Sequence, residues 1–150
     1  MKNIFDLEVT NEVIDRINQL HPESSRVWGS MSAAQMLAHC NVTYEMLYEK
    51  KHPKPGAVQK FFLKLFVKST VVNDKPYKKN GRTAPQFLVS DDKDFAAEKT
   101  RLINYIKRTQ EFGDSHFDHR ESHSFGKLTK KEWSNMFYKH LDHHLSQFGA

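Results

Sequence analysis

The sequence predicts an all-α fold, a four-helix bundle with an additional short helix, in a single domain over residues 1–150. Four long segments carry apolar residues at the helical spacing of three and four positions. Only 6 Gly and 5 Pro interrupt the 150 residues, so few breaks separate the helices. Hydrophobic residues make up 38% and charged residues 27%, a balance typical of one folded domain.

The first two helices are separated by a proline and by a helix-starting motif. Apolar spacing predicts the first helix over about residues 10–20, and it ends before Pro22 because the residue preceding proline avoids helical geometry. Ser32 and Gln35 have the spacing of a capping box, in which each side chain bonds the other residue's backbone N–H. They predict a second helix from Ser32 to about Lys50.

A shorter amphipathic helix is predicted over residues 57–70, where apolar residues alternate with lysines. We interpret its aromatic and aliphatic residues as anchors in the core; they are Phe61, Phe62, Leu65 and Phe66. Residues 71–91 are predicted to form a long basic loop. A further helix is predicted over about residues 92–108, with acidic residues at the positive end of its dipole. Residues 111–128 are predicted as a second loop.

The last helix is predicted to begin at a second capping box, formed by Thr129 and Glu132. It ends near Phe148, because Gly149 suits the left-handed conformation that often closes a helix.

Two histidines four residues apart on this last helix, His140 and His144, predict a metal site. Such residues lie about 40° apart around the axis and about 6 Å apart along it, so both imidazoles can face one point. Both fall within the apolar stripe, where an unpaired polar group costs about 1–3 kcal/mol. His39, on the inward face of the second helix, is the expected third ligand. Three histidines leave an open coordination position, as catalytic zinc sites do. The alternative to a metal site is a set of ordinary buried histidines that are hydrogen-bonded to backbone or water.

Other residues could join this site. The catalytic residue is unknown from sequence, and His123, just before the last helix, is the candidate for a proton carrier or an alternate ligand. His143 lies at the edge of the apolar stripe. Cys40, the single cysteine, is interpreted as a small buried apolar residue rather than a nucleophile. The loop residues His116 and His119 are weaker candidates than His123.

The positive charge is concentrated in one segment. Residues 50–82 hold ten Lys or Arg and one acidic residue, although the net charge of the whole chain is +5. We interpret this segment as a solvated basic face, with an acidic partner or nucleic acid as the less favoured reading. No stretch approaches the ~20 apolar residues of a membrane span, and the N-terminus lacks the apolar run of a signal peptide. We therefore expect a cytoplasmic protein without a membrane partner.

Three segments together resemble the DinB/YfiT-like helical bundle superfamily, and in particular a poorly characterised branch of it whose function is unknown. They read WGSMSAAQMLAHC at residues 28–40, SFGKLTKKEW at residues 124–133 and HLDHHLSQFG at residues 140–149. The resemblance implies a DinB-like four-helix bundle whose metal ion is held by His39, His140 and His144. It also implies a thiol-dependent S-transferase or isomerase that uses bacillithiol, mycothiol or glutathione, and a homodimer. It is weak over residues 50–82.

The leading hypothesis is a metalloenzyme with a divalent ion, zinc or nickel, on the three histidines. The ion binds a low-molecular-weight thiol and favours the thiolate, which attacks an electrophilic small-molecule substrate. A related version activates water for hydrolysis. The alternatives are a non-catalytic binding module that uses residues 50–82, and a scaffold protein whose site no longer catalyses a reaction.

Overall fold

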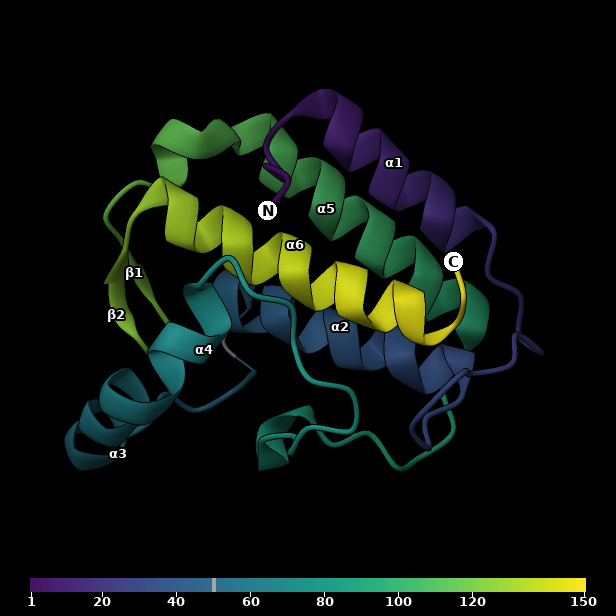
Figure 1. Cartoon of the computed structure of the whole chain (residues 1–150), viewed down its shortest axis with the longest axis horizontal. Helices are drawn as coiled ribbons and strands as arrows, with labels where there is room; N and C mark the ends of the chain where they lie inside the picture. Colours follow the sequence, from purple (N-terminus) through teal and green to yellow (C-terminus); the bar gives the residue numbers. More distant parts are fainter. Residues whose placement is uncertain (50) are drawn as a thin grey trace.

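Four long helices pack side by side in this computed structural model, which describes residues 1–49 and 51–150 (Figure 1). They are α1 (Leu7–Asn18), α2 (Ala33–Tyr48), α5 (Phe95–Phe117) and α6 (Lys130–Gln147). Helix α5 contacts the other three, and α2 also contacts α6. The predicted all-α bundle is therefore confirmed.

Helix α1 begins earlier than predicted, at Leu7, with Asp6 at its N-cap position. The prediction placed the start at Thr10, but the hydroxyl of Thr10 is buried and donates to the carbonyl of Ile4 at 2.7 Å. The Thr10 side chain therefore binds the segment before the helix and does not cap the helix.

The predicted start of α2 is confirmed by both bonds of its capping box. The backbone N–H of Ser32 donates to Gln35 Oε1 at 2.9 Å, and the N–H of Gln35 donates to Ser32 Oγ at 3.2 Å. The helix ends at Tyr48, and the predicted end at Lys50 lies outside the described residues.

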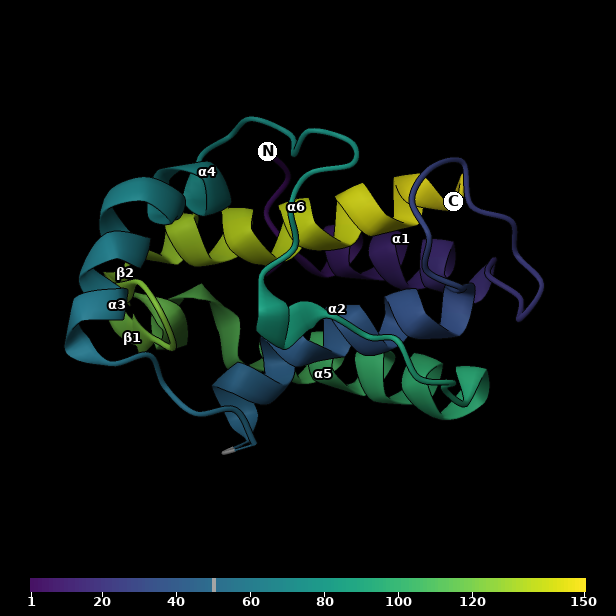
Figure 2. The same ribbon diagram turned by 90° about the horizontal axis from the view of Figure 1, so that it is seen from below.

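Residues 57–72 form a continuous helical segment that lies at one end of the bundle, beside the β-strands (Figures 1 and 2). It comprises α3 (Ala57–Phe62), a π-helical turn (Leu63–Val67) and α4 (Lys68–Val72). The helix was predicted, but the burial of its apolar residues was predicted wrongly. Their exposed fractions are 62% for Phe61, 52% for Phe62, 58% for Leu65 and 68% for Phe66.

The physical reason is that the opposite side of this segment faces the protein. Lys60 forms an ion pair with Glu121, and Lys68 Nζ lies 2.8 Å from Glu132 Oε1. Of the whole segment, only Val72 is buried among the core residues. The core of the bundle is filled by the long helices, so the apolar face of the segment is left in solvent.

The predicted basic loop follows α4 and runs from Asn73 to Asp94, with one 3₁₀ turn over Pro85–Phe87. The turn contacts α2, and Figure 2 shows the loop passing along α6 and then α2. A loop far away in the sequence thus reaches the helices that carry the candidate ligands.

Helix α5 is longer than predicted and ends at Phe117, with a kink at Gly113 where φ is +72°. The prediction of a loop over residues 111–128 is therefore partly wrong. Burial of Phe117 in the core extends the helix beyond what local periodicity indicated. After it, β1 (Arg120–Ser122) pairs antiparallel with β2 (Gly126–Leu128).

The capping box of α6 is confirmed. The backbone N–H of Thr129 donates to Glu132 Oε2 at 2.9 Å, and the N–H of Glu132 donates to Thr129 Oγ1 at 3.3 Å. Beyond the helix, Gly149 adopts a φ of +72°, as predicted for a C-terminal cap. None of the helices within residues 1–49 and 51–150 is both long and apolar enough to cross a lipid bilayer.

Candidate metal centre

Three histidines from two neighbouring helices converge in the interior of the bundle. His39 projects from α2, and His140 and His144 project from α6, which lies beside α2 (Figure 1). One ligand nitrogen from each ring lies within 4.8 Å of the other two. The Nε2 atoms of His39 and His140 are 3.0 Å apart. The predicted convergence of these three rings, hereafter the histidine cluster, is confirmed.

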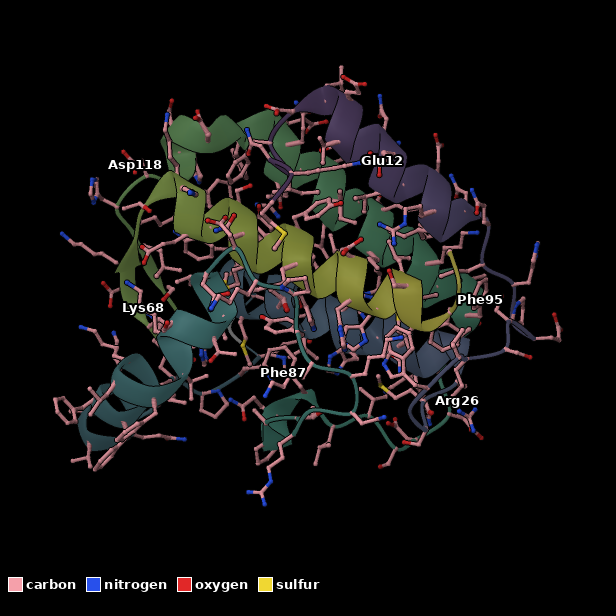
Figure 3. The ribbon with its side chains drawn as sticks, viewed as in Figure 1. Glu12, Arg26, Lys68, Phe87, Phe95 and Asp118 are labelled. Carbon is pink, nitrogen blue, oxygen red and sulfur yellow. The ribbon has the colours of Figure 1, made fainter. Side chains whose placement is uncertain are left out.

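The Nδ1 atom of His39 is held by a backbone carbonyl. It lies 2.8 Å from the carbonyl oxygen of Phe87, which can only accept, so Nδ1 carries the proton. Phe87, labelled in Figure 3, lies on the loop that passes α2 and α6. This bond leaves Nε2 of His39 as the nitrogen with the free lone pair, the form that binds metal ions.

The Nδ1 atom of His144 is held in the same way by a side chain. It lies 2.9 Å from Gln147 Oε1, while Gln147 Nε2 donates to the carbonyl of Trp28 at 2.8 Å. Because the Trp28 carbonyl needs a donor, the amide of Gln147 must present its oxygen to His144. Nε2 of His144 is therefore also left with a free lone pair.

A glycine makes this arrangement possible. Gly29 has a φ of +82°, and a Cβ atom at this position would lie 2.3 Å from Gln147 Nε2. The backbone N–H of Val27 also donates to the carbonyl of Gln147 at 2.7 Å. The segment around Trp28 thus fixes the amide that orients His144.

His140 has two possible protonation patterns. Its Nδ1 lies 3.1 Å from Thr43 Oγ1, and this hydroxyl can either donate or accept. Because His39 Nε2 carries a lone pair, the 3.0 Å contact to His140 Nε2 needs a proton or a cation between the two nitrogens. With a cation there, the proton of His140 moves to Nδ1 and donates to Thr43.

The geometry of these donors fits a divalent metal ion. Zinc binds histidine nitrogens at about 2.0–2.1 Å, so tetrahedral ligands lie about 3.3 Å from each other. The separations within the histidine cluster, 3.0 Å for one pair and at most 4.8 Å for the others, bracket this value.

The electrostatic surroundings keep the rings neutral. His39 and His144 are buried and His140 is half-buried. Burial is the main cause that lowers the pKa of all three imidazoles, and it lowers that of His144 to about 3. Neutral imidazole is the form that ligates metals, so the site is ready to bind a cation at neutral pH.

Aromatic side chains surround the histidine cluster on one side. The Phe87 ring lies 5.5 Å from that of His39 and 5.9 Å from that of His140, between ring centroids. His143 lies 5.0 Å from the His144 ring, and the rings of Trp28 and Tyr77 are each 5.7 Å from His143. His143, predicted at the edge of the stripe, is therefore the titratable neighbour of the cluster.

The structure does not bring the other candidate, His123, into the histidine cluster. Its ring nitrogens contact Ser124 Oγ at 2.9 Å and the carbonyl of His52 at 3.3 Å. In the described part of the chain, the converging group comprises His39, His140 and His144 alone. The weaker candidates His116 and His119 are exposed side chains outside the cluster.

Cys40 is buried, as predicted. It is 1% exposed, and burial raises the pKa of its thiol. Its Sγ lies 3.8 Å from Met36 Sδ, so it behaves as a small apolar residue of the core.

Sequence reasoning missed the groups that orient the ligands. Gln147 lies three residues from His144 on the same helix, so the helical period offered a signal for it. Thr43 lies on α2 but bonds His140 of α6, so its role depends on how the two helices pack. The carbonyl of Phe87 had no such signal, because any residue of the loop could have supplied a carbonyl.

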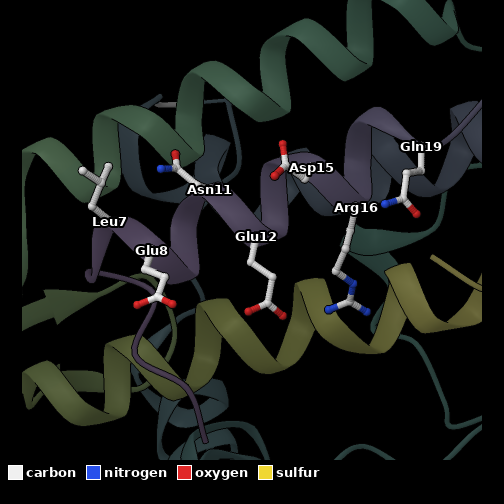
Figure 4. A pocket seen from close by; sticks show the side chains of 7 residues that line it. All are labelled: Leu7, Glu8, Asn11, Glu12, Asp15, Arg16 and Gln19. Atoms are coloured by element: carbon white, nitrogen blue, oxygen red, sulfur yellow. The ribbon is translucent and has the colours of Figure 1, made fainter.

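A surface depression along α1 contains none of these residues (Figure 4). Its central cation, Arg16, already binds Asp142 at 2.8 Å and the carbonyl of Ala150 at 3.0 and 3.2 Å. We therefore interpret Arg16 as a structural residue that links α1 to the C-terminal end of the chain.

The chain belongs to the family described as "Protein of unknown function (DUF1569)", whose profile matches residues 2–150. Comparisons with curated proteins and with solved structures gave no significant match. The match does not test the resemblance to the DinB/YfiT-like superfamily, which stays a prediction.

Proposed function

We propose that this member of the DUF1569 family is a metal-dependent enzyme whose divalent ion, zinc or nickel, is held by His39, His140 and His144. One observation carries the proposal: three neutral imidazoles converge, and each has its Nδ1 atom bonded to a neighbouring group. Outer partners of this kind orient metal-ligating histidines in many proteins.

The number of ligands points to catalysis and not to a closed structural site. Structural zinc sites use four protein ligands, whereas three protein ligands leave a position for a substrate. In the described part of the chain, no carboxylate or thiolate joins the histidine cluster. When bound there, a divalent ion lowers the pKa of a thiol or water molecule that occupies the open position.

A thiol S-transferase is the version that the surroundings favour. No carboxylate joins the cluster to act as a general base, and a thiol, with an ordinary pKa of about 8.5, loses its proton far more readily than water does. A thiolate attacks directly once its proton is lost, and the proposed acceptor of that proton is the half-buried His143, whose ring lies 5.0 Å from that of His144. The thiolate sulfur then bonds to an electrophilic carbon, and the leaving group departs with its electron pair.

The metal site is tested by elemental analysis of protein purified without chelator or affinity tag. The His140→Ala variant is expected to lose the metal and to keep its helical circular dichroism. The His143→Ala variant is the matched control, because it removes an adjacent histidine outside the cluster and should keep a full complement of metal. Stoichiometric metal in His140→Ala would contradict the assignment.

The reaction is tested by incubating the metal-loaded protein with monochlorobimane and one of glutathione, mycothiol or bacillithiol. In this transfer a carbon–sulfur bond forms, chloride leaves and the thiol proton is released. We expect turnover with one thiol and none with His140→Ala. Ester hydrolysis without thiol turnover would instead support the water-activating version.

A further inference from the structure

The helical segment at the end of the bundle carries a continuous exposed apolar surface. Six of the exposed large apolar side chains in the described part of the chain lie within residues 58–67. Their exposed fractions range from 37% for Val67 to 72% for Val58, and the other four are Phe61, Phe62, Leu65 and Phe66. We call these six residues the apolar ridge.

The aromatic rings of the ridge contact one another and not the core. Phe62 stacks on Phe66 with ring centroids 6.1 Å apart, and it contacts Phe61 edge-on at 5.7 Å. In both views the segment lies at the outer edge of the molecule, with one side turned to solvent (Figures 1 and 2). The ridge is therefore an exposed surface at the edge of the molecule, with a shallow, open depression lined by Val58, Phe62 and Phe66.

Lysines flank the ridge where it meets the β-hairpin. Lys60 pairs with Glu121, and the Lys64 ammonium approaches Gly126 of β2. The bond from Lys60, followed by the charges of Lys127 and Lys54, lowers the pKa of the Glu121 carboxyl. Three lysines therefore lie close enough to act on this one acidic residue, and Lys64 lies beside the same hairpin. We call Lys54, Lys60, Lys64 and Lys127 the flanking lysines.

The area of the ridge is large for a free surface and small for a stable protein interface. Its three Phe residues alone expose roughly 360 Å², taking about 200 Å² for each side chain. The largest apolar patch on a typical monomer covers about 300–600 Å², and such patches are often functional. The whole ridge, at roughly 600 Å², falls below the ~800 Å² that each partner contributes to a standard interface.

Charge also disfavours a second copy of the chain as the occupant. Two ridges in contact would bring their flanking lysines together, and like charges repel. A lipid surface needs no partner of matching shape, because an exposed apolar face can enter the boundary between headgroups and acyl chains. Anionic headgroups complement lysines that surround such a face.

We infer that the apolar ridge and the flanking lysines dock the protein onto an anionic lipid surface. The rings of the ridge enter the headgroup boundary. The exposed lysines Lys54, Lys64 and Lys127 contact the phosphates, while Lys60 keeps its ion pair with Glu121. This contact is peripheral and requires no membrane-spanning helix. It is also independent of the metal site, since the ridge shares no residue with the histidine cluster.

The inference is tested by co-sedimentation of the full-length protein with lipid vesicles. Vesicles of phosphatidylcholine with about 30% phosphatidylglycerol should bind the protein, and pure phosphatidylcholine should bind it at least ~10-fold more weakly. The double variant Phe61→Ser/Phe66→Ser should weaken binding to the anionic vesicles by ~10-fold or more. Neither change touches the buried core, so the melting temperature should not fall.

A matched control removes exposed apolar side chains elsewhere. Leu7 and Val27 are 60% and 67% exposed, and the double variant Leu7→Ser/Val27→Ser should bind vesicles as the unchanged protein does. Equal binding to both lipid compositions, or no binding to either, would overturn the inference. The oligomeric state is measured by light scattering. If the unchanged protein is a dimer and Phe61→Ser/Phe66→Ser is a monomer, the ridge is a site of self-association and the inference is overturned.

Discussion

Acidification is expected to destabilise the metal-free protein through His144. Burial lowers the pKa of this imidazole in the folded state to about 3, below its ordinary value of 6.5. Between these two values the unfolded chain binds a proton that the folded chain does not, so the free energy of unfolding falls as the pH falls. The stabilisation is complete above the ordinary pKa and is lost progressively below it.

The magnitude follows from the size of the shift. Each pKa unit corresponds to about 1.4 kcal/mol, so moving from about pH 7 to about pH 5 should remove about 2 kcal/mol through His144. The lowered pKa values of His39 and His140 act in the same direction. The paired carboxylates, such as Glu45 and Asp74, have lowered pKa values and contribute only at lower pH.

Urea unfolding of the metal-free protein across this pH range measures the effect. In the His144→Gln variant, which has no titrating ring at this position, the loss between the two pH values should be smaller by about 2 kcal/mol. Nuclear magnetic resonance titration of the folded protein gives an independent reading of the same group. A His144 ring that titrates near its ordinary pKa would refute the reasoning.

Two further predictions concern the segment around Trp28. Gln147→Ala removes the acceptor that orients His144, so we expect metal affinity to fall about 10- to 100-fold, measured by competition with a chromogenic chelator. Gly29→Ala places a Cβ 2.3 Å from Gln147 Nε2 at a φ of +82°, which should destabilise the fold by about 1–3 kcal/mol in thermal unfolding. Gly56→Ala is the matched control, because its Cβ would meet no atom within 4 Å. Equal stability of the two alanine variants would contradict the role assigned to Gly29.

Features that depend on a few neighbouring residues were predictable. Both capping boxes were predicted from pairs of residues three apart, and both form. The pair His140 and His144 was predicted from helical spacing, and His39 from the inward face of its helix. In each case the backbone of one helix determines where the side chains point.

Features that depend on distant contacts were not predictable in this way. Thr10 was expected to begin a helix, but it bonds Ile4 in the segment before α1. Helix α5 was expected to end at Arg108, but it continues until Phe117 enters the core. The carbonyl of Phe87, which fixes the tautomer of His39, comes from a loop 48 residues away along the chain.

The sequence by itself determined the four long helices, the capping boxes that begin α2 and α6, and the three rings that converge. Only the tertiary structure decided which neighbours orient those rings and which amphipathic face lies in solvent. Spacing of apolar residues identifies a face of a helix, but the ridge around Phe61 and Phe66 has the same pattern as a buried face. Its exposure follows from the long helices, which fill the core without it, while Lys60 and Lys68 of the segment pair with carboxylates of the protein.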